Sequence, residues 1–133
     1  MSYSVAIVGA TGVVGETLIS ILEEREFPIE TLYPLASSNS AGKRLEFREE
    51  SLKVEDLADF DFSKVQIAFF SAGGAVSEAY APKAAEAGCV VIDNTAHFRY
   101  EEDIPLVVPE VNPHAIAGYV NRNIIANPNC STI

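Results

Sequence analysis

The chain has 133 residues, of which 48% are hydrophobic and 21% are charged. This size and composition are typical of one globular domain and exclude global disorder, because a chain of this length can bury a hydrophobic core without disulfide or metal support. Nineteen acidic residues against nine basic ones give a net charge of -10, which repels phosphate backbones and anionic membranes. Neither nucleic acid nor a membrane is therefore an expected partner.

The cysteine and histidine content argues against stabilisation by disulfides or by a structural metal ion. Cys89 and Cys130 form no CxxC pair, and with two histidines they are too few for a disulfide framework or a structural zinc site. The first residues lack the basic flank and cleavage site of a signal peptide, and no run of about 18 apolar residues predicts a transmembrane helix. A reducing, cytoplasmic location without a bound metal is expected.

The first predicted element is a strand at residues 5–8, four consecutive apolar residues that end at Gly9. The lack of alternation is typical of a strand buried on both faces of a parallel sheet. An amphipathic helix is predicted over residues 13–26. Its expected core-facing residues are Val14, Leu18, Ile21 and Leu22. Residues 31–36 are predicted to form the second strand.

The rest of the chain continues to alternate between strands and helices. Residues 45–54 favour two short strands, and residues 55–63 read as an acidic connection. The later predicted elements are a buried strand at 65–70, an Ala-rich helix that ends at Gly88, strands at 90–92 and 124–126, and between these an apolar segment at 106–108 and a turn or short helix at 113–117. This order predicts an α/β fold with a doubly wound parallel sheet, Rossmann-like, whose ligand crevice lies at the carboxyl ends of the strands.

Three glycines, Gly9, Gly12 and Gly15, lie where the first strand becomes the first helix. Glycines at this point allow a tight turn and a close approach of the backbone to a pyrophosphate, which the helix N-terminus then binds. Their spacing is GxxGxxG, which differs by one residue from the usual GxGxxG. The alternative is a turn that needs a positive φ at Gly9 or Gly12 for its own geometry.

The segment after the second strand predicts which dinucleotide is preferred. An NAD site usually carries an acidic residue about 20 residues past the glycines, to bind the ribose 2′-hydroxyl. Residues 33–44 contain no Asp or Glu, whereas residues 37–40 supply polar groups and Lys43 and Arg44 supply positive charge. A 2′-phosphate suits this segment, so NADP is predicted over NAD. A plain solvated turn is the alternative.

Cys130 follows the last predicted strand and therefore belongs to the same edge of the sheet as the glycine turn. Asn129 or Ser131 is a suitable helix N-cap, and a thiol in the first turn of a helix has a lowered pKa. These features favour a reactive Cys130. The alternative is a buried, inert cysteine, which suits Cys89 better because Cys89 opens an apolar strand.

Several ordered motifs resemble those of aspartate-β-semialdehyde dehydrogenases, in the amino-terminal domain of that family. They include residues 9–15, 35–38, 40–43, 70–74, 93–94, 98–99, 107–113 and 127–132. The resemblance implies reductive dephosphorylation of L-aspartyl-4-phosphate to the semialdehyde with NADPH, a step toward lysine, threonine and methionine. It also implies that residues 1–133 form the NADP-binding domain, that a second domain for catalysis and dimerisation is absent from this sequence, and that the full-length enzyme is a homodimer or homotetramer.

The resemblance assigns roles to individual residues. It implies that Cys130 is the nucleophile, which forms a thioacyl intermediate, and that Arg99 and Asn129 bind the phosphate or acyl-phosphate group. The full set of predicted cofactor-binding residues is Gly9, Thr11, Gly12, Val13, Val14, Gly15, Ser37, Ser38, Asn39, Ser40, Ser71, Ala72, Gly73 and Asn94.

Two residues depart from the family pattern. Asn39 stands where members often have Arg, which removes a charged partner for the 2′-phosphate. His97 stands where many members have a small residue, and neither His97 nor His114 is predicted to be the acid/base of the reaction. Two alternatives remain: N-acetyl-γ-glutamyl-phosphate reductase, whose cysteine segment usually has Gly before the Cys and an aromatic residue after it, and a nucleotide-binding module without catalysis.

Overall fold

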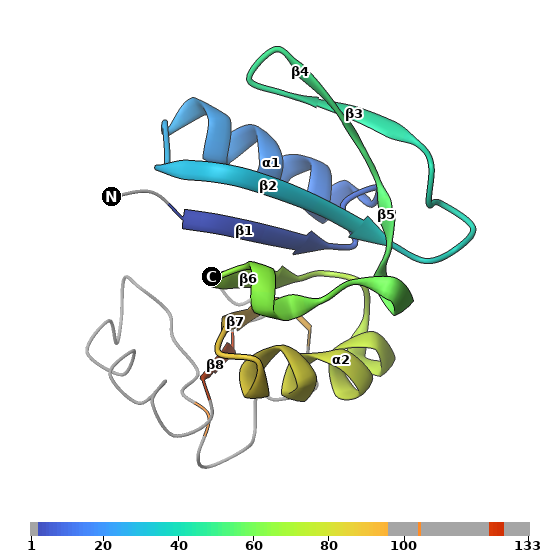
Figure 1. The fold of residues 1–133 in the computed structure, drawn as a ribbon, viewed down its shortest axis with the longest axis vertical. Coiled ribbons are helices and arrows are strands. Elements are labelled where there is room, and N and C mark those ends of the chain that lie inside the picture. Colours follow the sequence, from blue (N-terminus) through green and yellow to red (C-terminus); the bar gives the residue numbers. More distant parts are fainter. Residues whose placement is uncertain (1–2, 96–103, 105–122, 127–133) are drawn as a thin grey trace.

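The computed structural model describes residues 3–95, 104 and 123–126. The elements are β1 (Tyr3–Val8), α1 (Val13–Glu24), β2 (Ile29–Ala36), β3 (Arg44–Phe47), β4 (Glu50–Lys53), β5 (Glu55–Asp56), the 3-10 turns η1 (Leu57–Asp59) and η2 (Phe62–Lys64), β6 (Ile67–Phe70), α2 (Gly74–Glu86), β7 (Val90–Asp93) and β8 (Ile124–Ala126). Six strands of this described part form one sheet in the order β5-β2-β1-β6-β7-β8, and every pair in it is parallel. The predicted doubly wound parallel sheet is confirmed (Figure 1).

Strand β1 lies at the centre of this sheet and contributes to both of its faces. Val5, Ala6, Ile7 and Val8 are all 0% exposed. Val5 and Ile7 pack with the residues of α1, whereas Ala6 and Val8 pack with those of α2, so the two helices cover opposite faces (Figure 1). The continuous apolar run therefore reflects burial on both faces, as predicted.

Helix α1 is rotated relative to the prediction. Its buried residues are Gly15, Ile19 and Leu22, whereas the side chains of Val14 and Ile21 are 47% and 43% exposed. The prediction that Val14 and Ile21 face the core was wrong. The helix packs on the turn through Gly15, so its buried face consists of residues 15, 19 and 22, at positions i, i+4 and i+7.

The end of α1 is also earlier than predicted. Glu26 has a φ of +53°, its N–H donates to the Glu23 carbonyl, and the N–H of Phe27 donates to the Leu22 carbonyl. These two hydrogen bonds form a Schellman motif, which terminates a helix by a left-handed residue. The helix therefore ends at Glu24 rather than at residue 26.

Residues 44–59 form two distinct structures. Strands β3 and β4 pair as an antiparallel hairpin, and its two turn residues, Arg48 and Glu49, both have positive φ, as a type I′ turn requires. The predicted pair of short strands is confirmed. The acidic connection that follows contains a strand that sequence reasoning missed, since β5 pairs with β2 and forms one edge of the sheet.

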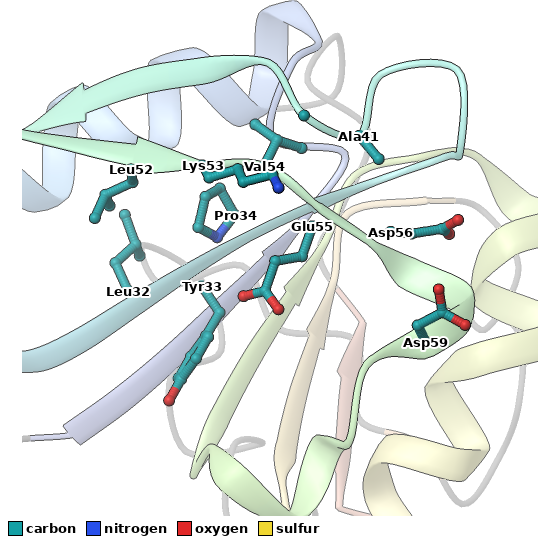
Figure 2. A pocket seen from close by; sticks show the side chains of 11 residues that line it. Leu32, Tyr33, Pro34, Ala41, Leu52, Lys53, Val54, Glu55, Asp56 and Asp59 are labelled. Atoms are coloured by element: carbon teal, nitrogen blue, oxygen red, sulfur yellow. The ribbon is translucent and has the colours of Figure 1, made fainter.

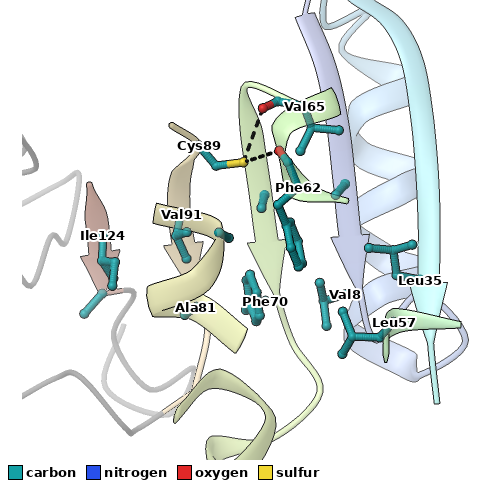
Figure 3. Packing of buried hydrophobic residues seen from close by; sticks show 14 of the residues in the cluster. Val8, Leu35, Leu57, Phe62, Val65, Phe70, Ala81, Cys89, Val91 and Ile124 are labelled. Atoms are coloured by element: carbon teal, nitrogen blue, oxygen red, sulfur yellow. Dashed lines mark hydrogen bonds between the residues drawn. The ribbon is translucent and has the colours of Figure 1, made fainter. Parts of the chain in front are cut away.

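Cys89 belongs to the core on the α2 side of the sheet, as Figure 3 shows. It is 0% exposed, and its Sγ lies 3.1 Å from the Phe62 carbonyl oxygen and 3.2 Å from that of Val65. Burial raises the pKa of the thiol from 9.0 to about 11, because a thiolate is disfavoured away from water. The prediction of a buried Cys89 is confirmed.

We expect Cys89 to resist alkylation and to make stability fall at alkaline pH. The folded state keeps the thiol proton to a higher pH than the unfolded state, so this stabilisation is complete below pH 9 and is lost as pH rises toward 11. The loss is at most about 1.4 kcal/mol per pH unit. Urea unfolding at pH 8, 9 and 10 measures it, with Cys89→Ala as the control for all other titrating groups.

If the unfolding free energies of the wild-type chain and of Cys89→Ala changed equally with pH, this expectation would be contradicted. Limiting iodoacetamide at neutral pH, followed by peptide mapping, gives a second readout, in which Cys130 is labelled before Cys89. Preferential labelling of Cys89 would contradict it equally.

Neither described helix has the length and apolar character that a membrane crossing would need. The predicted segments at 106–108 and 113–117 lie outside the described residues.

Candidate cofactor-binding site

The site lies where the direction of the sheet reverses. From β1 the chain crosses to β2 on one side, and from β6 it crosses to β7 on the other. The loops that follow β1 and β6 therefore meet at the carboxyl edge, and the Ser71 N–H and hydroxyl both donate to the Val8 carbonyl, at 2.9 and 3.0 Å. Ligands of doubly wound sheets bind at this switch point.

The turn between β1 and α1 depends on glycine at two positions. Gly9 has a φ of +89°, and a Cβ built on it would lie 2.9 Å from the Ser71 carbonyl carbon. Gly15 has helical geometry, but a Cβ there would lie 2.2 Å from the Gly9 carbonyl oxygen. The turn is anchored to β2, because the N–H groups of Gly9 and Ala10 both donate to the Leu35 carbonyl. Positive φ thus explains Gly9, and close packing of helix on turn explains Gly15.

The N-terminus of α1 presents backbone donors at this edge. Gly12 is the N-cap and makes no side-chain cap hydrogen bond. The first intrahelical bond is the one from Glu16 N–H to the Gly12 carbonyl, so the N–H groups of residues 13–15 have no partner within the helix. An uncapped helix N-terminus beside a glycine turn is suited to a phosphate group.

Two cavities flank this helix N-terminus. One has a volume of about 430 Å³ and is lined by predicted residues from the β1, β2 and β6 loops: Gly9, Thr11, Ser37, Ser38, Ser40 and Ala72. The other, of about 450 Å³, is lined by Val13, Val14, Ser71 and Asn94. The structure thus brings ten of the predicted cofactor residues to one edge of the sheet. Gly12, Gly15, Asn39 and Gly73 line neither cavity.

The first of these cavities is called the β2-side cavity below, and it contains residues that sequence reasoning missed. Asp56, Leu57 and Ala58 reach it from β5 and η1, and Val76 and Tyr80 reach it from α2. They stand far from the glycine turn in the sequence and carry no motif. Only the pairing of β5 with β2 brings the first three of them beside Ser37.

Arg44 does not supply the charge that the sequence suggested. Its Nε donates to the Ser51 hydroxyl at 2.8 Å, and its Nη2 donates to the Ser51 carbonyl at 3.1 Å. The guanidinium is thereby held across the β3–β4 hairpin, because Arg44 and Ser51 lie on paired strands. Lys43 is exposed, and neither cation lines the β2-side cavity. The positive charge that the sequence offers at residues 43 and 44 is therefore not part of the described lining of this cavity.

A larger groove of about 680 Å³ is lined mainly by residues of β2, β4 and β5 and by none of the predicted cofactor-binding residues. Its lining includes Glu55, Asp56 and Asp59, with Lys53 as its cation. Figure 2 shows Asp56 and Asp59 at the end of this groove away from Leu32 and Leu52. The three carboxyl groups disfavour a phosphate here, so the glycine-edged cavities are the better candidates for a dinucleotide.

Asp93 orders the loop that carries Asn94. It is 0% exposed, and its carboxyl oxygens accept hydrogen bonds from the Ser77 hydroxyl at 2.7 Å and from the Thr95 N–H and hydroxyl at 3.2 and 2.8 Å. The Asn94 N–H donates to the Phe70 carbonyl at 2.8 Å. The end of β7 is therefore tied both to α2 and to β6.

The predicted substrate and catalytic residues, Arg99, Asn129 and Cys130, lie outside the described residues, as do His97 and His114. Within residues 3–95, 104 and 123–126, no group of three or more side chains is arranged to hold a metal ion.

Comparison with known proteins identifies the family. The model of the family described as "Semialdehyde dehydrogenase, NAD binding domain" matches residues 4–119. The aspartate-semialdehyde dehydrogenase of Legionella pneumophila is 67% identical over 130 residues, which are 98% of this chain and 38% of that protein. This chain spans about two-fifths of the length of such curated relatives.

Two solved structures agree with this match. Aspartate semialdehyde dehydrogenase II from Vibrio cholerae, complexed with ASA, has a TM-score of 0.98 and 62% identity, covering 100% of this chain and 44% of that one. Aspartate semialdehyde dehydrogenase with NADP from Candida albicans has a TM-score of 0.80 and 31% identity, covering 99% and 44%. The chain belongs to the family of semialdehyde dehydrogenase NAD-binding domains.

Proposed function

We propose that this chain is the cofactor-binding part of an NADP-dependent aspartate-semialdehyde dehydrogenase. The reaction is the reversible, phosphate-dependent conversion of L-aspartyl-4-phosphate to L-aspartate 4-semialdehyde, toward lysine, threonine and methionine. The observation that carries the proposal is the glycine turn at the switch point of the sheet, with its two flanking cavities, in a chain of this family. The second domain, a cytoplasmic location and a homodimeric or homotetrameric enzyme belong to the same proposal.

The residues at the edge fit a nicotinamide dinucleotide. Side chains at Gly9 and Gly15 would collide with backbone, so the turn packs closely on the first turn of α1, whose N–H groups would bind the phosphates of the dinucleotide. The β2-side cavity would hold the adenosine half, with Ser37, Ser38, Asn39 and Ser40 binding the 2′-phosphate of NADP. The cavity lined by Val13, Val14 and Asn94 would hold the nicotinamide half. When bound, NADPH supplies the hydride that reduces the acyl carbonyl.

The chemistry on the substrate belongs to residues assigned by resemblance. The Cys130 thiolate attacks the acyl carbon of the aspartyl phosphate, the bond to phosphate breaks, and inorganic phosphate leaves as the thioester forms. Arg99 presents a planar fork that matches phosphate bidentately, and Asn129 binds the same group. Once the carbonyl has been reduced, the bond to sulfur breaks, so the aldehyde is released and Cys130 returns to the thiolate.

A chimera tests this proposal. We would replace the matching part of the Legionella pneumophila enzyme by this chain and follow phosphate-dependent NADPH formation from aspartate semialdehyde. Activity is expected, and Cys130→Ala is expected to abolish it without changing the thermal unfolding temperature. The 133-residue chain alone is expected to bind NADP without sustained turnover, because general acid–base groups worth about 10²–10⁴-fold in rate lie in the second domain of the proposal.

Three outcomes would contradict the proposal. A folded chimera that binds NADP but shows no phosphate-dependent reaction would exclude the activity, with the unaltered Legionella enzyme as the positive control. Full activity of the Cys130→Ala chimera would exclude the nucleophile. Sustained turnover by the isolated chain would show that it is a complete enzyme.

A further inference from the structure

One carboxyl group lies in the wall of the β2-side cavity, which contains no cationic side chain among its described lining residues. Asp56 shares this lining with Ser37, Ser38 and Ser40, the residues that stand where a 2′-phosphate would bind. A carboxylate at this place favours a ribose hydroxyl and disfavours a phosphate.

The position of Asp56 follows from the sheet. β5 pairs with β2 in parallel, and Asp56 is the register partner of Ala36, the residue directly before Ser37. Dinucleotide sites that prefer NAD usually carry their acidic residue at the end of the second strand. In this chain the end of β2 has no acidic residue. The neighbouring edge strand β5 instead places Asp56 beside the last residue of β2.

The backbone holds Asp56 in place. Its Oδ1 accepts a hydrogen bond from the Ala58 N–H at 3.0 Å and so caps η1, and the residue is half-buried. Asp56 also lines the larger groove, where Lys53 is the basic residue, but Lys53 does not line the β2-side cavity. Arg44 is held by Ser51 in the hairpin. No cation among the described residues lines the cavity to offset the charge of Asp56.

We propose that Asp56 determines the dinucleotide specificity of this chain: its carboxylate accepts the ribose 2′-hydroxyl of NAD and repels the 2′-phosphate of NADP. The preference for NADP is thereby limited, and NAD is also bound. This inference rests on the proposed function, since it concerns the same cofactor site. The presence of Asn39 agrees with this inference, because residues 37–40 then contain no charged side chain that could bind the 2′-phosphate.

The test is isothermal titration of NADP and NAD into the wild-type chain and into Asp56→Asn. Asn keeps the side-chain oxygen that caps η1 and removes only the charge. We expect NADP to bind about fivefold tighter to the variant, the effect of one removed charge contact near water, while NAD binding is unchanged or weaker. The gain should shrink as salt is added.

Asp59→Asn is the matched control. Asp59 lies three residues further on, is exposed, and lines the larger groove but not the β2-side cavity. Asp59→Asn changes the net charge by the same amount as Asp56→Asn, but outside the β2-side cavity. NADP affinity should therefore change less than twofold. Asp56→Ser, which also preserves a capping oxygen, should reproduce the effect of Asp56→Asn, and thermal unfolding checks that all variants are folded.

The outcomes separate the two proposals. Equal tightening by Asp56→Asn and Asp59→Asn would reduce the effect to net charge and overturn the role of Asp56. Unchanged NADP binding in both Asp56 variants would overturn it as well. If the wild-type chain bound neither dinucleotide, the proposed function would fail, and the specificity inference with it.

Discussion

Replacing Gly15 by alanine is expected to destabilise the domain by about 3 kcal/mol, at the upper end of what overpacking costs. In an ordinary helix interior the same change would stabilise by about 1 kcal/mol, because alanine is the better helix former. Here the added Cβ would lie 2.2 Å from the Gly9 carbonyl oxygen and 2.9 Å from the Ala10 Cα. Both are backbone atoms, so helix α1 must move away from the turn.

Urea unfolding measures this loss, and Gly12→Ala is the control. A Cβ at Gly12 would lie 3.5 Å from the Gly9 carbonyl oxygen, an ordinary contact, and its φ is -83°. We expect Gly12→Ala to cost less than about 1 kcal/mol, the usual effect of a poorer N-cap. A Gly15→Ala protein as stable as the wild type would contradict the close packing of α1 on the turn.

Removing the carboxyl group of Asp93 is expected to cost about 3 kcal/mol of unfolding free energy. Asp93→Ala leaves the Ser77 hydroxyl and the N–H and hydroxyl of Thr95 without this acceptor, at a buried site where each lost partner costs about 1–3 kcal/mol. No buried side-chain nitrogen or oxygen among the described residues lacks a partner in the wild-type chain. The same change should weaken dinucleotide binding, because Asn94 follows directly.

Ser77→Ala is the matched comparison for Asp93→Ala. It removes one donor and leaves the two hydrogen bonds from Thr95, so we expect a loss of about 1 kcal/mol. Thermal and urea unfolding of both variants gives the difference. If Asp93→Ala were no more destabilising than Ser77→Ala, Asp93 would not be the residue that ties the end of β7 to α2.

Elements with a strong local signal could be predicted from the sequence. Strands β1, β6 and β7 stand out as short apolar runs, although only β1, at residues 5–8, is fully buried on both faces, and residues of β6 and β7 alternate between buried and half-buried. Gly88, with a φ of +101°, follows the end of α2. Strand β5 could not be predicted, since its two residues are acidic and become a strand only through pairing with β2. The rotation of α1 likewise depends on a tertiary contact, that of Gly15 with Gly9.

The candidate site also contains residues that could be predicted from local sequence and residues that could not. The glycine turn and residues 37–40 are recognisable because each is a short, contiguous segment at the end of a strand. Asp56 and Tyr80 are not, because sheet order and helix packing bring them to the β2-side cavity from later in the chain. The hydrogen bonds of Arg44 to Ser51 could not be predicted either, because the register of the β3–β4 hairpin brings these two residues together.

We expect the dinucleotide to bind across the α1 N-terminus, between the loops after β1, β2 and β6. Titration of NADP into the chain, followed by assigned amide chemical shifts, measures where it binds. Saturable shifts are expected at Gly9, Thr11, Ser38 and Ser71, with residues 50–53 of the hairpin nearly unchanged. The largest shifts in the groove lined by Leu52 and Glu55, or no saturable shift at Gly9 and Thr11, would contradict it.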